Sequence, residues 1–419
     1  MFEPLRQIKK YSFDSLACSP ILFMQKKRSA VSTKEVIVFT SCSMILTALG
    51  IDIMLPALGA IRQHFGLPDN SPATANLISY FFMGQITQLF FGYLTDRYGR
   101  LPILRLGFVI YIACGIATVF APALSIMLLL RFFSGMGAAA VLMTAIASVR
   151  DQYAGSEMAR VMSFVLTIML LTPVIAPALG SFVLLHTSWQ IVCVIPPLFA
   201  IPVFLWSFRL AETHPPEARL KTGFIKSMPQ LWYVLSNRLF MRYCITATII
   251  FSILTAYVSS SERIIGELYL QPSMFPWIFG TIGAVMAVFA LSNSYFTKRF
   301  GAKKVLRFFL TAYLLVSMLF VALHYIIDNP LPLWYFVLCI GLLMSFTVAA
   351  DPNSSALALE PMGSKAGIAA SVYGTLFFFI GSLIGTVINH FMIANVLPLA
   401  VAALIVSVVG MILVFSERN

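Results

Sequence analysis

The feature that most constrains this chain is a series of apolar runs, each close to twenty residues long. An α-helix needs about 20 apolar residues to cross the hydrocarbon core of a bilayer. Of 419 residues, 59% are hydrophobic and 11% are charged, whereas a soluble domain has about 25% charged residues. The sequence therefore predicts an all-α membrane protein with twelve transmembrane helices, at 35–57, 73–95, 103–121, 124–148, 159–184, 189–208, 238–260, 275–296, 304–323, 332–350, 366–389 and 392–415.

Basic residues are distributed unevenly along this series. The net charge is +12, and most Lys and Arg residues lie in the tails, in the longest break between spans, or beside alternate loops. Arg62 and Arg263 fall outside this set of tails and loops, and Arg131 falls within a span. Short cytoplasmic loops collect Lys and Arg, so we expect a multi-pass protein of the inner membrane with both termini cytoplasmic. The positive charge then reflects topology and not a nucleic-acid surface.

The longest polar break divides the spans six to six. The expected units are a cytoplasmic tail (1–34), a six-helix bundle (35–208), a cytoplasmic linker with one surface helix (209–237), a second bundle (238–415) and a cytoplasmic end (416–419). An internal repeat supports the division, because Asp96-Arg-Tyr-Gly-Arg100 recurs as Lys298-Arg-Phe-Gly-Ala302 half a chain later. Duplicated halves suit alternating access, in which one half rocks against the other.

Residues that carry covalent or metal chemistry are sparse. The six Cys residues are scattered without Cys-x-x-Cys spacing or His pairing, so neither a disulfide framework nor a metal site is expected. No phosphate-binding loop is present, which excludes ATP-driven pumping by this chain alone. The sequence has no nucleophile–base set that would indicate an enzyme. It also has no filter loop that would indicate a channel. We therefore expect no enzymatic activity and no cofactor, and Met24 is an alternative start of the chain.

Two opposite charges lie within predicted spans of the first half. Asp52 lies about one and a half turns from the outer end of span 1, and Arg131 lies about two turns from the outer end of span 4. An ionised carboxylate among apolar neighbours costs several kcal/mol unless it is paired or protonated. We expect both residues to face the central cavity and to form the proton-coupling site. A purely structural buried ion pair is the alternative.

A short basic hairpin joins spans 2 and 3. Its sequence, Gly92-Tyr-Leu-Thr-Asp96-Arg97-Tyr-Gly99-Arg100, resembles motif A of the major facilitator superfamily in spacing, residue types and position. The resemblance implies the major facilitator fold, with twelve transmembrane helices in two pseudo-symmetric six-helix halves. It also implies a gating role for these five motif positions.

The expected gating role has a physical basis. Asp96 ends span 2 on the predicted cytoplasmic side, where span 11 should begin near Ala366. A helix N-terminus carries partial positive charge and attracts a carboxylate. We therefore expect Asp96, together with Arg100, to latch the halves in the outward-facing state. The alternative is an ordinary solvated loop charge.

Span 5 carries Pro173, Pro177 and Gly180 on one helical face, because their spacings are four and three. Proline bends a span, and glycine permits close helix contact. The stretch resembles motif C of the superfamily's antiporters, with Pro173 and Ala176 where glycines are common. The segment 131–137 resembles motif B in the same way. Motif C favours export over import.

Three further segments narrow the resemblance to the twelve-span drug:H⁺ antiporters of the bicyclomycin-resistance (Bcr/CflA) type. They are 52–58 in span 1, 188–190 at the entry to span 6, and 352–374 around spans 10 and 11. Where this group tends to read Ser-Pro-Phe, the chain has Ser261-Glu262-Arg263. These two charges either alter the extracellular gate or the substrate range, or form a local surface ion pair.

Together these features predict a proton-coupled antiporter that exports small, lipophilic or amphipathic compounds such as drugs by alternating access. A major facilitator importer of a metabolite or siderophore is the main alternative, and a membrane receptor or enzyme is the other. The expected partners are a small-molecule substrate, protons and membrane lipid, for a monomer that binds no nucleic acid. Polar residues expected in the cavity are Tyr80, Gln85, Gln88, Tyr257 and Tyr373.

Overall fold

The computed structural model describes residues 32–221, 228–327, 331–392 and 395–416. Within these residues, twelve helical stretches are long and apolar enough to cross a membrane. Each overlaps one of the twelve predicted spans, so the predicted all-α fold is confirmed. Most of the expected tails, with the alternative start at Met24, lies outside the described residues.

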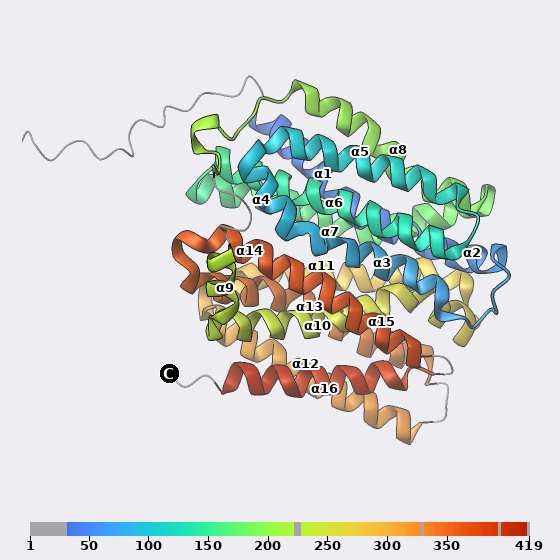
Figure 1. Cartoon of the computed structure of the whole chain (residues 1–419). Coiled ribbons are helices and arrows are strands. Elements are labelled where there is room, and N and C mark those ends of the chain that lie inside the picture. The colour runs from blue at the N-terminus through green and yellow to red at the C-terminus, as the bar shows by residue number, and fades with distance from the viewer. Residues whose placement is uncertain (1–31, 222–227, 328–330, 393–394, 417–419) are drawn as a thin grey trace, which may run out of the picture.

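The helices form two halves that lie side by side, blue to green and yellow to red in Figure 1. The first half contains α1 (Thr33–Asp52), α2 (Leu58–His64), α3 (Asn76–Gly84), α4 (Gln88–Tyr98), α5 (Arg100–Ala117), α6 (Leu124–Gln152), α7 (Gly155–His186) and α8 (Trp189–Trp206). The short helix α9 (Met228–Ser236) follows in the linker. The second half contains α10 (Arg238–Arg263), α11 (Phe275–Phe300), α12 (Ala302–Ile326), α13 (Leu333–Leu359), α14 (Ala366–Thr375), α15 (Gly381–Phe391) and α16 (Leu397–Phe415).

The internal repeat has the same backbone form in both halves. Gly99 separates α4 from α5 with φ +101°, and Gly301 separates α11 from α12 with φ +83°. Only glycine adopts such angles readily, which explains why a glycine stands at this position in both copies. We call the end of the molecule with Gly99 the motif A end and the opposite end the far end; α4, α9 and α14 lie at the motif A end (Figure 1).

Four spans are interrupted in their middle or toward the far end. Short 3₁₀ turns follow α1 (Leu55–Ala57) and α3 (Gln85–Thr87), and π-helical turns follow α10 (Ile264–Leu268) and α14 (Leu376–Ile380). These interrupted spans pack across the two halves, through α3 with α15, α4 with α14, and the turn after α1 with α10. Such interruptions recur at functional sites, because they free backbone groups and re-aim side chains. The contact between the halves is therefore also the irregular part of the fold.

Candidate functional site

Asp52 is the last residue of α1. The chain tightens directly after it, since the Met54 N–H bonds to the Ile51 carbonyl and Pro56 has no N–H to offer the Asp52 carbonyl. The Asp52 residue is 6% exposed. Within the described residues its carboxylate makes no hydrogen bond and no ion pair. The first half thus holds a lone carboxylate at a helix break.

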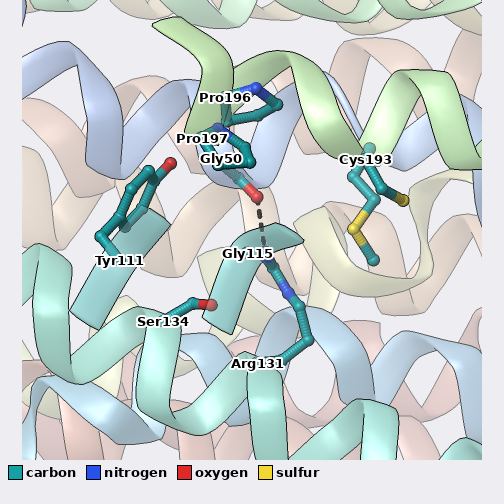
Figure 2. Close-up of a pocket in the computed structure, with 9 residues that line it drawn as sticks. Gly50, Tyr111, Gly115, Arg131, Ser134, Cys193, Pro196 and Pro197 are labelled. Carbon is teal, nitrogen blue, oxygen red and sulfur yellow. Dashed lines mark hydrogen bonds between the residues drawn. The ribbon is translucent and has the colours of Figure 1, made fainter. Parts of the chain in front are cut away.

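Arg131 of α6 binds the backbone at the same helix break, just before Asp52. Because Met54 bonds to Ile51, the Gly50 carbonyl loses its usual helical donor, and Arg131 Nη2 donates to it at 2.7 Å (Figure 2). Arg131 Nε donates to the Leu77 carbonyl at 3.3 Å. The guanidinium also lies over the Phe81 ring at 4.5 Å. Arg131 therefore holds the α1 backbone two residues before Asp52.

The structure corrects one expectation about Arg131. It faces a cavity of about 10 Å³ inside the first half, enclosed by α1, α5, α6 and α8 (Figure 2), and not the contact between the halves. Such a volume holds about one water molecule, and the Ser134 hydroxyl beside it has no hydrogen-bond partner among the described residues. Arg131 and Asp52 form no direct ion pair, because main-chain carbonyls occupy the guanidinium.

At the motif A end, α4 and α14 meet directly. A Cβ atom on Gly92 would lie 3.4 Å from Ser371 Cβ and closer still to its hydroxyl. One turn away, the Leu89 N–H donates to Thr375 Oγ1 at 3.2 Å. Gly92 thus permits a close approach of the two halves at this end.

Arg100 is the centre of the charged network in motif A. It is 3% exposed, and its guanidinium donates to Asp151 at the end of α6 (2.7 Å) and to Asp96. Glu212 of the linker accepts hydrogen bonds from the Arg100 and Leu101 N–H groups, at 2.8 and 3.1 Å. The first turn of α5 is therefore capped by the linker, a partner that the sequence pattern gave no means of finding.

The expected latch partner of Asp96 is not the one seen. Its carboxylate bonds to Arg100 within the first half, and no hydrogen bond joins it to the first turn of α14 among the described residues. Arg97 also stays within its own helix, where its guanidinium donates to the Tyr93 hydroxyl at 2.7 Å. In this conformation the halves meet through Gly92, and the motif A charges order the hairpin behind it.

Motif C connects three helices. Pro173 lies against Gly283 of α11 in the second half, where a Cβ would approach Pro173 Cβ to 3.3 Å. About two turns further along α7, a Cβ on Gly180 would overlap the Ile53 carbonyl oxygen and lie 3.0 Å from Pro56 Cγ. Gly180 thus packs against the turn that follows Asp52. Pro177 lies between these two contacts within α7.

Aromatic rings fill the contact between the halves beside the π-turn of span 11. Phe82 of α3 packs against Phe251 of α10 and Phe378 at ring-centroid distances of 5.6 and 6.1 Å. Phe251 in turn stacks on Phe377 at 4.0 Å. Edge and offset contacts of this kind also suit planar aromatic ligands. This group of four residues is the inter-half aromatic cluster.

Two of the five expected cavity residues lie next to this cluster. Gln88 donates to Gln85 Oε1 at 3.0 Å, and a Cβ on Gly374 of α14 would overlap Gln88 Oε1. The Gln85 amide nitrogen is buried without a partner among the described residues. A polar group left unsatisfied at an inter-half contact is available to a ligand.

The three tyrosines are separated. Tyr257 lies inside the second half, stacked on Phe279 at 6.0 Å, with its hydroxyl unpartnered among the described residues. Tyr373 donates to Asp351 at 2.7 Å. Tyr80 is partly buried on α3. The structure therefore does not gather all five predicted polar residues in one place.

The charges at the end of span 7 make a long-range contact. Glu262 does not pair with its neighbour Arg263; Arg62 of α2, 200 residues earlier, donates to Glu262 at 3.3 Å and to Glu267 at 3.2 Å. Arg62 and Glu262 are 2% and 13% exposed. These two ion pairs, which we call the far-end lock, join the halves at the end opposite motif A.

Breaking the far-end lock should destabilise the protein. Removing one partner of a buried pair leaves an uncompensated charge and costs about 3 kcal/mol. We expect Arg62→Gln to lower the unfolding free energy in detergent by this amount, while Arg160→Gln, at an exposed arginine of α7, has almost no effect. Adding Glu262→Gln should recover part of the loss. Equal stabilities of Arg62→Gln and Arg160→Gln would contradict the lock.

A second intramembrane acid was missed because span 10 is longer than expected. The predicted span ended at residue 350, whereas α13 continues to Leu359 and places Asp351 inside the helix. The sequence signal was present, since 351–359 contains only this one charge. The Pro at 352 favoured a helix end instead.

Comparisons with known proteins agree with this architecture. A bicyclomycin resistance protein homolog of Haemophilus influenzae is 26% identical, over 85% of this chain and 89% of that protein. A chloramphenicol resistance protein of Pseudomonas aeruginosa is 26% identical, over 81% of each chain. The crystal structure of the human organic anion transporter MFSD10 superposes with a TM-score of 0.68 at 16% identity, over 92% of this chain and 99% of that one.

The xylose transporter XylE of E. coli, in a partially occluded inward-open conformation, superposes with a TM-score of 0.69 at 11% identity, over 91% of this chain and 96% of that one. At such identities the likeness shows the fold alone. The family model described as Major Facilitator Superfamily matches residues 40–386, which is most of the chain. The protein is thus a multi-pass membrane transporter that belongs to the major facilitator superfamily.

Proposed function

We propose that this transporter exports small lipophilic or aromatic compounds across the inner membrane in exchange for protons. The observation that carries the proposal is Asp52, a buried carboxylate without a hydrogen bond or ion pair among the described residues. Without a cation, such a group avoids the cost of burial by taking up a proton. It therefore provides a site whose occupancy follows the proton gradient.

The chemistry between the halves supports an apolar substrate. The inter-half aromatic cluster offers ring faces, and Gln85 and Gln88 offer amide groups beside them. No ion pair of the described residues lies at this level; the far-end lock and the Arg100 network lie at the two ends. The relatives named for bicyclomycin and chloramphenicol resistance support export of drug-like compounds.

The helix break at Asp52 suggests how protons and substrate compete. Arg131 and Gly180 hold the backbone on both sides of the break. Substrate that enters from the cytoplasm displaces the proton from Asp52, and a proton from outside later restores the neutral acid and releases the substrate. In this scheme motif A lies on the cytoplasmic side, both termini are cytoplasmic, and a monomer is sufficient.

Inverted membrane vesicles test the proposal directly. The vesicles are energised until they are acid inside, and chloramphenicol, a lipophilic cation or a siderophore-like compound is added while a pH-sensitive dye reports the internal pH. We expect chloramphenicol or the cation to release protons from vesicles that contain the protein and not from vesicles that lack it. If no export candidate causes proton release and whole cells take up a metabolite, the protein would instead be an importer.

A further inference from the structure

The second half contains a carboxylate that the scheme above does not use. Asp351 lies within α13, about 12 Å from the helix end at Leu359. Asp52 ends α1, about 28 Å from the start of this helix at Thr33, and its span continues beyond it to His64. The two acids therefore lie in different halves and at different depths, with Asp351 nearer the motif A end.

The surroundings of Asp351 offer a hydrogen bond but no positive charge. Its Oδ1 accepts from the Tyr373 hydroxyl of α14 at 2.7 Å. Within the part of the chain that the structure describes, Cys244 of α10 is the other titratable group that faces this pair. Helices α11 and α12 also pack on α13, and among the described residues they bring no charged side chain into contact with Asp351. Among the described residues, the Tyr373 hydroxyl is thus the group that stabilises an ionised Asp351.

The partner of Asp351 belongs to the helix that closes the motif A end. The next two residues after Tyr373 make the contact with α4, because Gly374 packs on Gln88 and Thr375 accepts from the Leu89 N–H. The Tyr373 ring packs on Phe377 of the inter-half aromatic cluster at 5.8 Å. A change in the Asp351–Tyr373 bond therefore acts on the segment of α14 that touches the first half.

We propose that Asp351 is a second proton-binding site and that its bond with Tyr373 couples protonation to closure of the motif A end, an inference that rests on the proposed function. A hydrogen bond to an ionised carboxylate is stronger than one to a neutral acid. The ionised form holds Tyr373 and keeps α14 against α4. The protonated form weakens that bond and favours separation of α4 from α14.

Infrared spectroscopy detects the proton without any substrate. The probe is the carboxylic-acid band in spectra of the purified chain in lipid nanodiscs, recorded between neutral and acid pH in the Asp52→Asn background. We expect a band that disappears with Asp351→Asn, shifts in frequency with Tyr373→Phe, and is unchanged with Glu360→Gln at an exposed acid beyond α13. A spectrum that Asp351→Asn leaves unaltered would overturn the second site.

A disulfide measures the closure. Cysteines introduced at Gly92 and Ser371 would have Cβ atoms 3.4 Å apart, close to the separation of about 3.8 Å in disulfides. In a background without native cysteines, we expect Asp351→Asn to slow cross-linking by at least about tenfold at neutral pH. The ratio of the variant's cross-linking rate to the parent's should approach one at acid pH, where Asp351 of the parent is protonated too. The pH dependence of the thiols affects both proteins equally and cancels in this ratio.

The two tests separate the possible failures. Equal cross-linking with and without Asp351→Asn at every pH would overturn the coupling to α14. An Asp351 band and a pH-dependent cross-link in a protein that shows no proton release with any exported compound would remove the proposed export function and leave Asp351 as a proton site of another transport cycle.

Discussion

Asp52→Asn is expected to abolish proton-coupled transport in inverted vesicles while the protein remains folded in the membrane. The amide is nearly isosteric with the acid but cannot bind and release a proton. Because the Asp52 carboxylate has no partner among the described residues, its loss breaks no ion pair. We therefore expect the melting temperature in detergent to be unchanged or raised, since the variant removes a buried group that is costly to ionise.

A matched variant controls this experiment. Asp69→Asn makes the same chemical change at an exposed acid of the far-end loop, and it should transport at the rate of the parent. Substrate binding to Asp52→Asn, measured with radiolabelled chloramphenicol, should persist and lose the part of its pH dependence that comes from Asp52. Active pumping by Asp52→Asn against a gradient would show that the proton site lies elsewhere.

The second large effect is expected from one methyl group at Gly180. A Cβ there would overlap the Ile53 carbonyl oxygen, which belongs to the backbone and cannot rotate away. Overpacking of this kind costs about 1–3 kcal/mol, and the helix propensity gained with alanine returns about 1 kcal/mol. The α1 break must shift to make room. A displacement of about 1 Å at a site can cost up to 100-fold in rate, so we expect Gly180→Ala to slow transport at least about tenfold.

The control is a helical glycine with open space around it. No heavy atom lies within 4 Å of a Cβ built on Gly367 in α14, so Gly367→Ala should match the parent in transport rate and have an equal or higher melting temperature, because alanine also favours the helix there. Gly180→Ala should show both a lower melting temperature and slower proton release. If Gly180→Ala behaves like Gly367→Ala, motif C does not position the Asp52 turn by close packing.

The repeated hairpin shows what a local pattern predicts well. The glycines at 99 and 301 were predicted to be equivalent by their neighbours alone, and both have positive φ between consecutive helices. Asp52 was identified by a similar local argument, because one carboxylate in a long apolar run is unusual whatever surrounds it. The expectation that the tyrosines line one cavity was less accurate, since the sequence does not say which face of a buried helix meets the other half.

Contacts between distant segments could not be predicted from the sequence. Arg62 and Glu262 are 200 residues apart. Only the packing of α2 against α10 shows that Glu262 pairs with an arginine of the other half and not with its neighbour Arg263. Arg131 was expected to sense Asp52 directly, whereas its guanidinium donates to main-chain carbonyls. Its partner is a main-chain carbonyl that becomes available only because the helix tightens after Asp52.

The sequence by itself determined the number of spans, the repeat and the lone acid in span 1. Lipid imposes length and apolarity on each span separately, and these are properties of short segments. Only the tertiary structure decided the partners of Arg131, the far-end lock, the capping of α5 by Glu212 and the bond between Asp351 and Tyr373. A charge in an apolar interior takes the acceptor or donor that packing brings to it, and no local pattern records which one that is.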